Sequence, residues 1–236
     1  MAPEELEIPG LQYHLTHVKI VETGGKISYG QTVRFPVTYS QGWKYIMVLQ
    51  YCGSNAILAD PLKSCAESEL LREITSLYKH ITGRGLQPHL HILDNTCSSG
   101  VIIFILSADA HHQLVPPGLH RALVYEWEIQ TFKHHLIAGL SSCNPKFPLN
   151  LWCRLIRQAV LTLNLLYPSK LNLWLFDEAV LNRAFDFNQT PLVPPRNQSP
   201  HFEGSGDHHT FSHNRVEEWY LGPDPEHYIC YTVYVL

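Results

Sequence analysis

The alternation of apolar and polar positions predicts an early block of three β-strands. The runs at 44–52 and 55–62 are short, apolar and rich in strand-forming residues. Gly53 and Ser54 separate them, so we expect a hairpin of two buried strands. A weaker strand pattern precedes this hairpin at 26–37.

Helical periodicity replaces the strand pattern from Ser64 onward. Apolar residues recur there at spacings of three and four until the stop signal TGRG, which predicts a helix at about 65–82. The segment HLHIL then returns to the strand period, and QLVPP is a further short strand. Two more helices are predicted at about 120–140 and 149–166, whereas 98–109 is a strand-prone apolar run. Strands that alternate with helices indicate an α/β fold.

Composition divides the chain into four parts. A lead segment at 1–23 precedes a core at 24–185, which holds most of the predicted strands and helices. The range 186–214 is rich in Pro, Asn, Ser and His, which predicts an irregular linker. The range 215–236 has two strand-like runs around a Gly-Pro-Asp-Pro turn, and we expect a small β extension there.

The overall composition favours a folded globular protein. Of the 236 residues 45% are hydrophobic and 16% are charged, and the formal net charge is −4. Because the whole chain is not basic, any binding of phosphate would depend on a local group of basic residues. The six cysteines lack zinc-site spacing and indicate free thiols in a reducing compartment. The start, MAPEELEIPG, lacks the pattern of a signal peptide, and the longest apolar run is too short to span a bilayer. We therefore expect an intracellular protein with no membrane association.

Two acidic residues are the main candidates for chemistry. Asp94 directly follows the strand HLHIL, where it is either a turn-forming residue or a metal ligand at the end of a central strand. Glu126 lies one position off the apolar stripe of its helix, where it either belongs to a solvated face or converges with Asp94 on a divalent ion. Two carboxylates with two such ions can hold the attacking and leaving oxygens of a phosphodiester.

The order of these elements resembles the integrase catalytic core encoded by long-terminal-repeat retrotransposons. The motifs that carry the resemblance are RFPVT, GWKYIMVLQYCGSNAILADPL, RGLQPHLHILDN, QLVPP, QTFKHHLIAGL, WCRLIRQAVLTLNLL, FDFNQTPLVPP and WYLGPDPEHYICYTVYV, and together they cover roughly 24–236. The resemblance implies an RNase H-like fold, in which helices flank a mixed five-stranded sheet. It also implies DNA strand transfer that depends on Mg²⁺ or Mn²⁺, a homo-oligomer, and a nuclear location for a functional protein.

The resemblance assigns roles to individual residues. Asp94 takes the position of the second catalytic aspartate and Glu126 that of the catalytic glutamate, so both would be metal ligands. The DNA-binding face on the same helix would comprise Gln130, Lys133 and His134. The first catalytic aspartate, however, is replaced by Gly30. In the family this carboxylate bridges both metal ions, so its loss is expected to abolish both metal affinity and activity.

Three hypotheses follow from the sequence. The first is an active strand transferase that acts on DNA. The second is a degenerate copy that keeps the fold and some DNA affinity but has no catalytic activity, and Gly30 favours it. The third is a product that folds poorly, because the segment 98–109 departs from the amphipathic helix expected in the family.

Overall fold

A computed structural model describes residues 24–39, 41–94, 97–115, 124–193, 198–202, 215–224 and 227–235. The predicted lead segment 1–23 lies outside the described residues, as do Asn95 and Thr96 beside Asp94.

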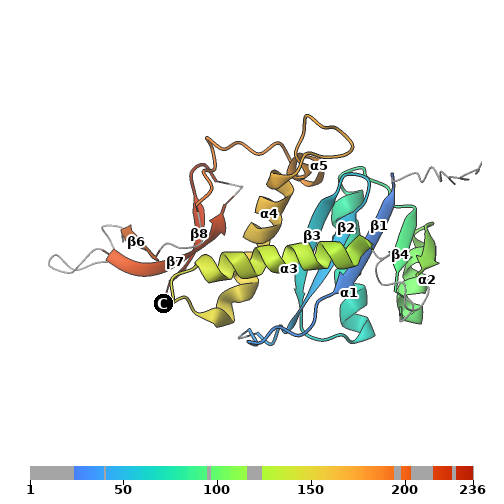
Figure 1. Cartoon of the computed structure of the whole chain (residues 1–236), viewed down its shortest axis with the longest axis horizontal. Helices are drawn as coiled ribbons and strands as arrows, with labels where there is room; N and C mark the ends of the chain where they lie inside the picture. Colours follow the sequence, from blue (N-terminus) through green and yellow to red (C-terminus); the bar gives the residue numbers. More distant parts are fainter. Residues whose placement is uncertain are drawn as a thin grey trace, which may run out of the picture.

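A five-stranded mixed sheet forms the centre of the protein (Figure 1). Its strands are β1 (Lys26–Gln31), β2 (Tyr45–Tyr51), β3 (Ala56–Leu62), β4 (Leu90–Leu93) and β5 (His111–Leu114), in the spatial order β3-β2-β1-β4-β5. Neighbours among β1, β2 and β3 run antiparallel, whereas β4 is parallel to β1 and β5 is parallel to β4. The predicted α/β class and the mixed five-stranded sheet are therefore confirmed.

The hairpin between β2 and β3 depends on its turn residues. Asn55 has a φ of 84°, a left-handed conformation that asparagine tolerates better than most residues. A Cβ atom at Gly53 would lie 2.7 Å from the ring of Tyr51, so glycine is required there by close approach. The hydroxyl of Ser54 accepts a hydrogen bond from the backbone N–H of Ala56, which starts β3.

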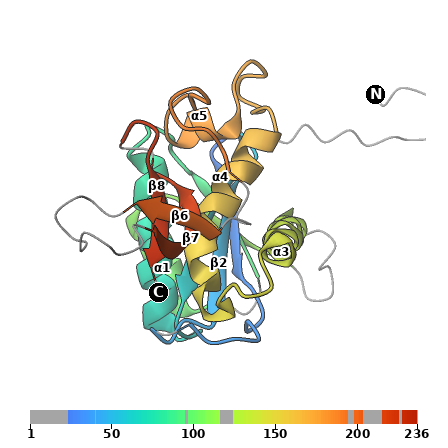
Figure 2. The same ribbon diagram turned by 90° about the vertical axis from the view of Figure 1, so that its left-hand side faces the viewer.

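Helices cover both faces of the sheet (Figure 2). One face packs against α1 (Glu67–Thr82) and α2 (Ser99–Ser107), and the other packs against α3 (Val124–Ser142), the 3-10 helix η2 (Leu149–Leu155) and α4 (Ile156–Leu166). Because strand side chains alternate, neighbouring residues of β2 serve different cores. Met47 and Leu49 contribute to the α1 face, and Ile46 and Val48 to the α3 face.

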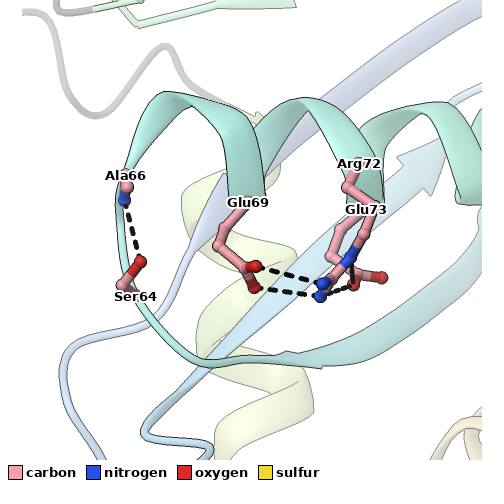
Figure 3. A network of polar contacts seen from close by, with 5 residues as sticks. All are labelled: Ser64, Ala66, Glu69, Arg72 and Glu73. Atoms are coloured by element: carbon pink, nitrogen blue, oxygen red, sulfur yellow. Dashed lines mark hydrogen bonds and ion pairs between the residues drawn. The ribbon is translucent and has the colours of Figure 1, made fainter.

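The first turns of α1 show how its exposed surface is stabilised (Figure 3). The hydroxyl of Ser64 accepts a hydrogen bond from the N–H of Ala66, just before the helix begins. Arg72 donates two hydrogen bonds to the carboxylate of Glu69, at 3.0 and 2.9 Å, and also pairs with Glu73. Exposed pairs of this kind contribute at most about 1 kcal/mol each, so burial of Ile74, Leu77 and Ile81 dominates the stability of α1.

The prediction of a strand-prone run at 98–109 is wrong, because this segment forms α2. The strands β4 and β5 are parallel neighbours, and a parallel pair requires a crossover connection. The buried residues Val101 and Ile105 lie four positions apart and face the sheet, while Ile103 and Leu106 remain exposed. The reason for expecting a poorly folding product therefore no longer holds.

The C-terminal part contains a short helix and a second sheet. The helix is α5 (Asp177–Leu181), and the sheet has the order β6-β7-β8, formed by β6 (Gln198–Phe202), β7 (Arg215–Pro223) and β8 (Tyr231–Val235). β6 lies within the predicted linker 186–214, so that range is not irregular throughout. Trp219 of β7 packs edge-on against Phe147, which joins the small sheet to the α3-side core. None of the described helices has both the length and the apolar character needed to cross a bilayer.

Candidate carboxylate site beside the central strands

The register of β1 and β4 relates Gly30 to Asp94. Ser28 of β1 pairs with Ile92 of β4, and continuing this parallel register by two residues brings Gly30 level with Asp94. Asp94 follows β4 directly and is half-buried. Gly30 pairs with Val48 of β2 and is not among the described glycines with positive φ. The backbone at Gly30 is thus ordinary strand that other residues can adopt.

The same face of the sheet holds both positions. Ile92 packs with Val115 against Ile129 of α3, so the even-numbered side chains at this end of β4 face α3. Ser28 and Gly30 share this face of β1, because Ser28 pairs with Ile92. By continued alternation the side chain of Asp94 is directed toward the same side.

Glu126 lies near the start of α3, three residues before Ile129, and its side chain is half-buried. The stripe of α3 that faces the sheet is marked by Glu128, Phe132 and Leu136, and Glu126 flanks it as a neighbour of Ile129. The two predicted carboxylates therefore come from elements that meet on one side of the sheet. Their separation of roughly 4 to 7 Å, expected for a shared ion, stays a prediction.

The residues present do not fit a centre for two metal ions. Gly30 supplies no ligand, and the nearest side chain along the same face of β1 is that of Ser28. Its hydroxyl is fully buried and lies 3.9 Å from the thiol of Cys52, so it cannot replace a carboxylate. Within the described parts of the chain, no three His, Cys, Asp or Glu side chains are grouped so that they could hold a metal ion.

Glu128 is a site residue that the sequence interpretation missed. The side-chain amide of Gln50 on β2 donates a hydrogen bond of 2.8 Å to Oε1 of Glu128, which ties α3 to the sheet. Burial raises the pKa of Glu128, and the nearby charge of Lys170 and the bond from Gln50 act in the opposite direction. Its spacing of four from the buried Phe132 was the available signal, because residues at this spacing share one helix face.

Asp177 is a second acidic residue that the sequence interpretation missed. It is 1% exposed, and its Oδ1 atom has no hydrogen-bond partner among the described residues. Burial raises its pKa to about 6, although hydrogen bonds from Ser169 and Ser54 and the charge of Lys170 favour the ionised form. The charge of Glu128 raises this pKa further, so the two carboxylates are electrostatic neighbours. Nothing in the local sequence DEAV distinguishes this aspartate from an ordinary first-turn acid.

The predicted DNA-binding face lies on the middle of α3. Gln130 and His134 are exposed, and their side-chain nitrogens lie 3.0 Å apart, as expected for residues one turn apart. Lys133 is half-buried. A ring nitrogen of the neighbouring His135 is hydrogen-bonded to the hydroxyl of Thr162, at 2.7 Å. Burial lowers the pKa of His135, so this residue adds no charge to the face at neutral pH.

Comparison with known proteins finds no protein family whose model matches the chain and no characterised protein with significant sequence similarity.

Proposed function

We propose that this chain is an RNase H-like domain of the integrase type that binds DNA through its phosphates and does not catalyse strand transfer. Three features support the fold assignment. They are the sheet order β3-β2-β1-β4-β5, the parallel arrangement of β4 and β5 with β1, and the crossing of α3 over the face that Ile92 presents. Asp94 and Glu126 occupy the positions that such a domain uses for carboxylates.

The loss of catalysis rests on Gly30, which is level with Asp94 when the register of Ser28 and Ile92 is continued by two residues. A carboxylate there would bridge two Mg²⁺ or Mn²⁺ ions, which polarise the phosphodiester and generate the attacking nucleophile when they are bound. Without it, Asp94 and Glu126 retain two of three charges, so binding of even one ion is weakened. The hydroxyl of Ser28 does not compensate, because a neutral hydroxyl neither carries charge nor bridges two ions.

DNA binding through the α3 face should be weak and sensitive to salt. Lys133 is the one lysine among the three residues of this face, and a lysine contact with phosphate releases condensed counterions from the duplex. Gln130 and His134 can add hydrogen bonds to phosphate oxygens, but these contacts carry no sequence information. The expected binding is therefore independent of DNA sequence.

Fluorescence anisotropy of a labelled duplex at several salt concentrations tests this proposal. Lys133→Ala should reduce the slope of log K against log salt by about 0.9, the value for one phosphate contact. Lys79→Ala is the matched control, because Lys79 is exposed on α1, on the opposite face of the sheet. Unchanged affinity of Lys133→Ala at low salt would exclude the α3 face. A strand-transfer product formed by the parent protein with Mg²⁺ or Mn²⁺ would refute the absence of catalysis.

A further inference from the structure

A pocket of about 770 Å³ lies at the β3 edge of the sheet. Its walls are β3, α1, α4, α5, the segment 182–190 and the hairpin of β7 and β8. β3 is separated from β4 by β2 and β1, so this pocket is distinct from the carboxylate site at Asp94. Its volume is within the range of about 300–1,000 Å³ that is usual for pockets that bind small molecules.

Arginine side chains line this pocket from several elements. Arg84 follows α1, Arg154 and Arg157 come from η2 and α4, and Arg183 follows α5; all four are exposed. Nε of Arg154 donates a hydrogen bond of 3.1 Å to the hydroxyl of Tyr39, which fixes its guanidinium group. Within the described structure, the guanidinium groups of Arg84 and Arg157 make neither a hydrogen bond nor an ion pair. Their charges nevertheless favour the ionised form of Glu178, which lines the same pocket.

The acidic residues of the pocket are already engaged within the protein. The side-chain amide of Asn182 donates a hydrogen bond of 2.6 Å to Oε1 of Glu178, which is 7% exposed. Oδ1 of Asp186 accepts hydrogen bonds from two backbone N–H groups of its own turn. Burial and the charge of Glu73 raise the pKa of Asp60 to about 6, so this residue is only partly ionised near that pH. Neutral donors leave the charge of a carboxylate in place, but the four arginines of the lining outnumber its three acidic residues, so the pocket carries positive charge that an anion can neutralise.

The interior of the pocket offers aromatic surface. The side chain of Gln158 is 7% exposed and is directed to another partner, because its Nε2 donates a hydrogen bond of 2.9 Å to the carbonyl of Val193, which does not line the pocket. Its Oε1 is buried without accessible surface, so it is closed to a molecule bound in the pocket. Trp43 and Phe185 also line the pocket and are half-buried, so each presents part of a ring.

We propose that this pocket binds a nucleoside phosphate. Arg84 and Arg157 donate hydrogen bonds to the phosphate oxygens, because guanidinium groups match phosphate geometry and the N–H groups of these two are not used in hydrogen bonds within the described structure. The base packs on the exposed part of Phe185, because one face of the Trp43 ring is already stacked on Tyr39. This role is independent of the carboxylate site and of DNA binding through α3. The ligand is either a free nucleotide or the terminal nucleotide of a single strand, which share this chemistry.

Isothermal titration calorimetry of the full chain tests the proposal with three probes: AMP, a short 5′-phosphorylated oligonucleotide and inorganic phosphate. AMP or the oligonucleotide should bind, and whichever is tighter identifies the source of the ligand. Arg84→Gln and Arg157→Gln should each weaken that binding by about tenfold, as expected for loss of one charge-assisted hydrogen bond. Arg72→Gln is the matched control, since Arg72 is an exposed arginine of α1 that does not line the pocket.

A further variant tests recognition of the base. Phe185→Ala should weaken the binding of AMP by about tenfold, while any weak binding of inorganic phosphate stays unchanged. A thermal melt of each variant establishes that it is folded, and Phe185→Leu decides the matter if Phe185→Ala does not fold. The proposal is overturned if neither AMP nor the oligonucleotide binds, if inorganic phosphate binds as tightly as AMP, or if Arg157→Gln and Arg72→Gln behave alike.

Discussion

Replacing Asp177 by asparagine should stabilise the protein at neutral and alkaline pH and have little effect in acid. Asp177 is the first residue of α5, is almost completely buried, and has one carboxylate oxygen without a partner among the described residues. Burial outweighs the bonds from Ser169 and Ser54, so the folded protein favours the protonated carboxyl. Asparagine keeps the size of this side chain and removes the charge.

The magnitude follows from the two pKa values. The pKa of the carboxyl is 3.8 in the ordinary state and about 6 in the folded protein. The folded state therefore holds its proton more tightly, and stability falls as the pH rises from about 3.8 to about 6. At about 1.4 kcal/mol for each pKa unit, ionisation of Asp177 lowers the free energy of unfolding by about 3 kcal/mol above this window. Only a small part of this effect remains near pH 4.

Urea unfolding of the parent and Asp177→Asn at pH 4 and pH 8 measures this difference. Distant groups that titrate between these values contribute equally to both proteins and cancel in the comparison, whereas Glu128 is coupled to Asp177 and its titration is part of the measured difference. We expect the variant to gain about 2 to 3 kcal/mol relative to the parent between pH 4 and pH 8. A gain that is the same at both pH values, or a loss at pH 8, would refute the assignment of Asp177 as a destabilising buried carboxylate.

Two further predictions concern buried polar residues. Asn164 of α4 accepts a hydrogen bond from the N–H of Ile57 on β3 and donates one to the carbonyl of the same residue. Asn164→Ala should therefore lower the free energy of unfolding in urea by about 2 to 4 kcal/mol, and a loss below about 1 kcal/mol would contradict this. His91 is fully buried and burial lowers its pKa to about 4, so its protonation costs stability as the pH falls from 6.5 to about 4, opposite in sign to the contribution of Asp177. His91→Gln should remove this loss, and an unchanged pH profile would contradict it.

The sequence predicts the sheet well because its strands carry local signals. The hairpin of β2 and β3 follows from two apolar runs and a Gly-Ser turn, and α1 follows from its helical spacing. α2 was missed because its apolar residues continue all round the helix, so no periodicity distinguishes it from a buried strand. Its helical state is imposed by the crossover between parallel strands, which is a property of the whole sheet.

The candidate site could be predicted only in part. Asp94 and Glu126 follow from the order of elements and the resemblance that it supports. The bond between Gln50 and Glu128 joins residues 78 positions apart, and the burial of Asp177 depends on how α5 packs. The pocket at β3 likewise gathers its arginines from elements distant in sequence. Such contacts arise from tertiary packing and leave no local pattern.

The response of Gly30→Asp to divalent metal shows whether Asp94 and Glu126 belong to a metal site that lacks one carboxylate. This substitution returns a carboxylate to β1, level with Asp94, on backbone that accepts it. Thermal melts of the parent, Gly30→Asp and Gly139→Asp should be recorded with and without Mg²⁺ or Mn²⁺; Gly139 lies on α3 with open space around it and serves as the control. A metal concentration of about 100 times Kd adds about 2.7 kcal/mol, or roughly 5 to 10 °C in Tm. We predict this rise in Tm for Gly30→Asp and almost none for the parent and Gly139→Asp. Equal metal responses in all three proteins would contradict the assignment of Asp94 and Glu126 to a metal site.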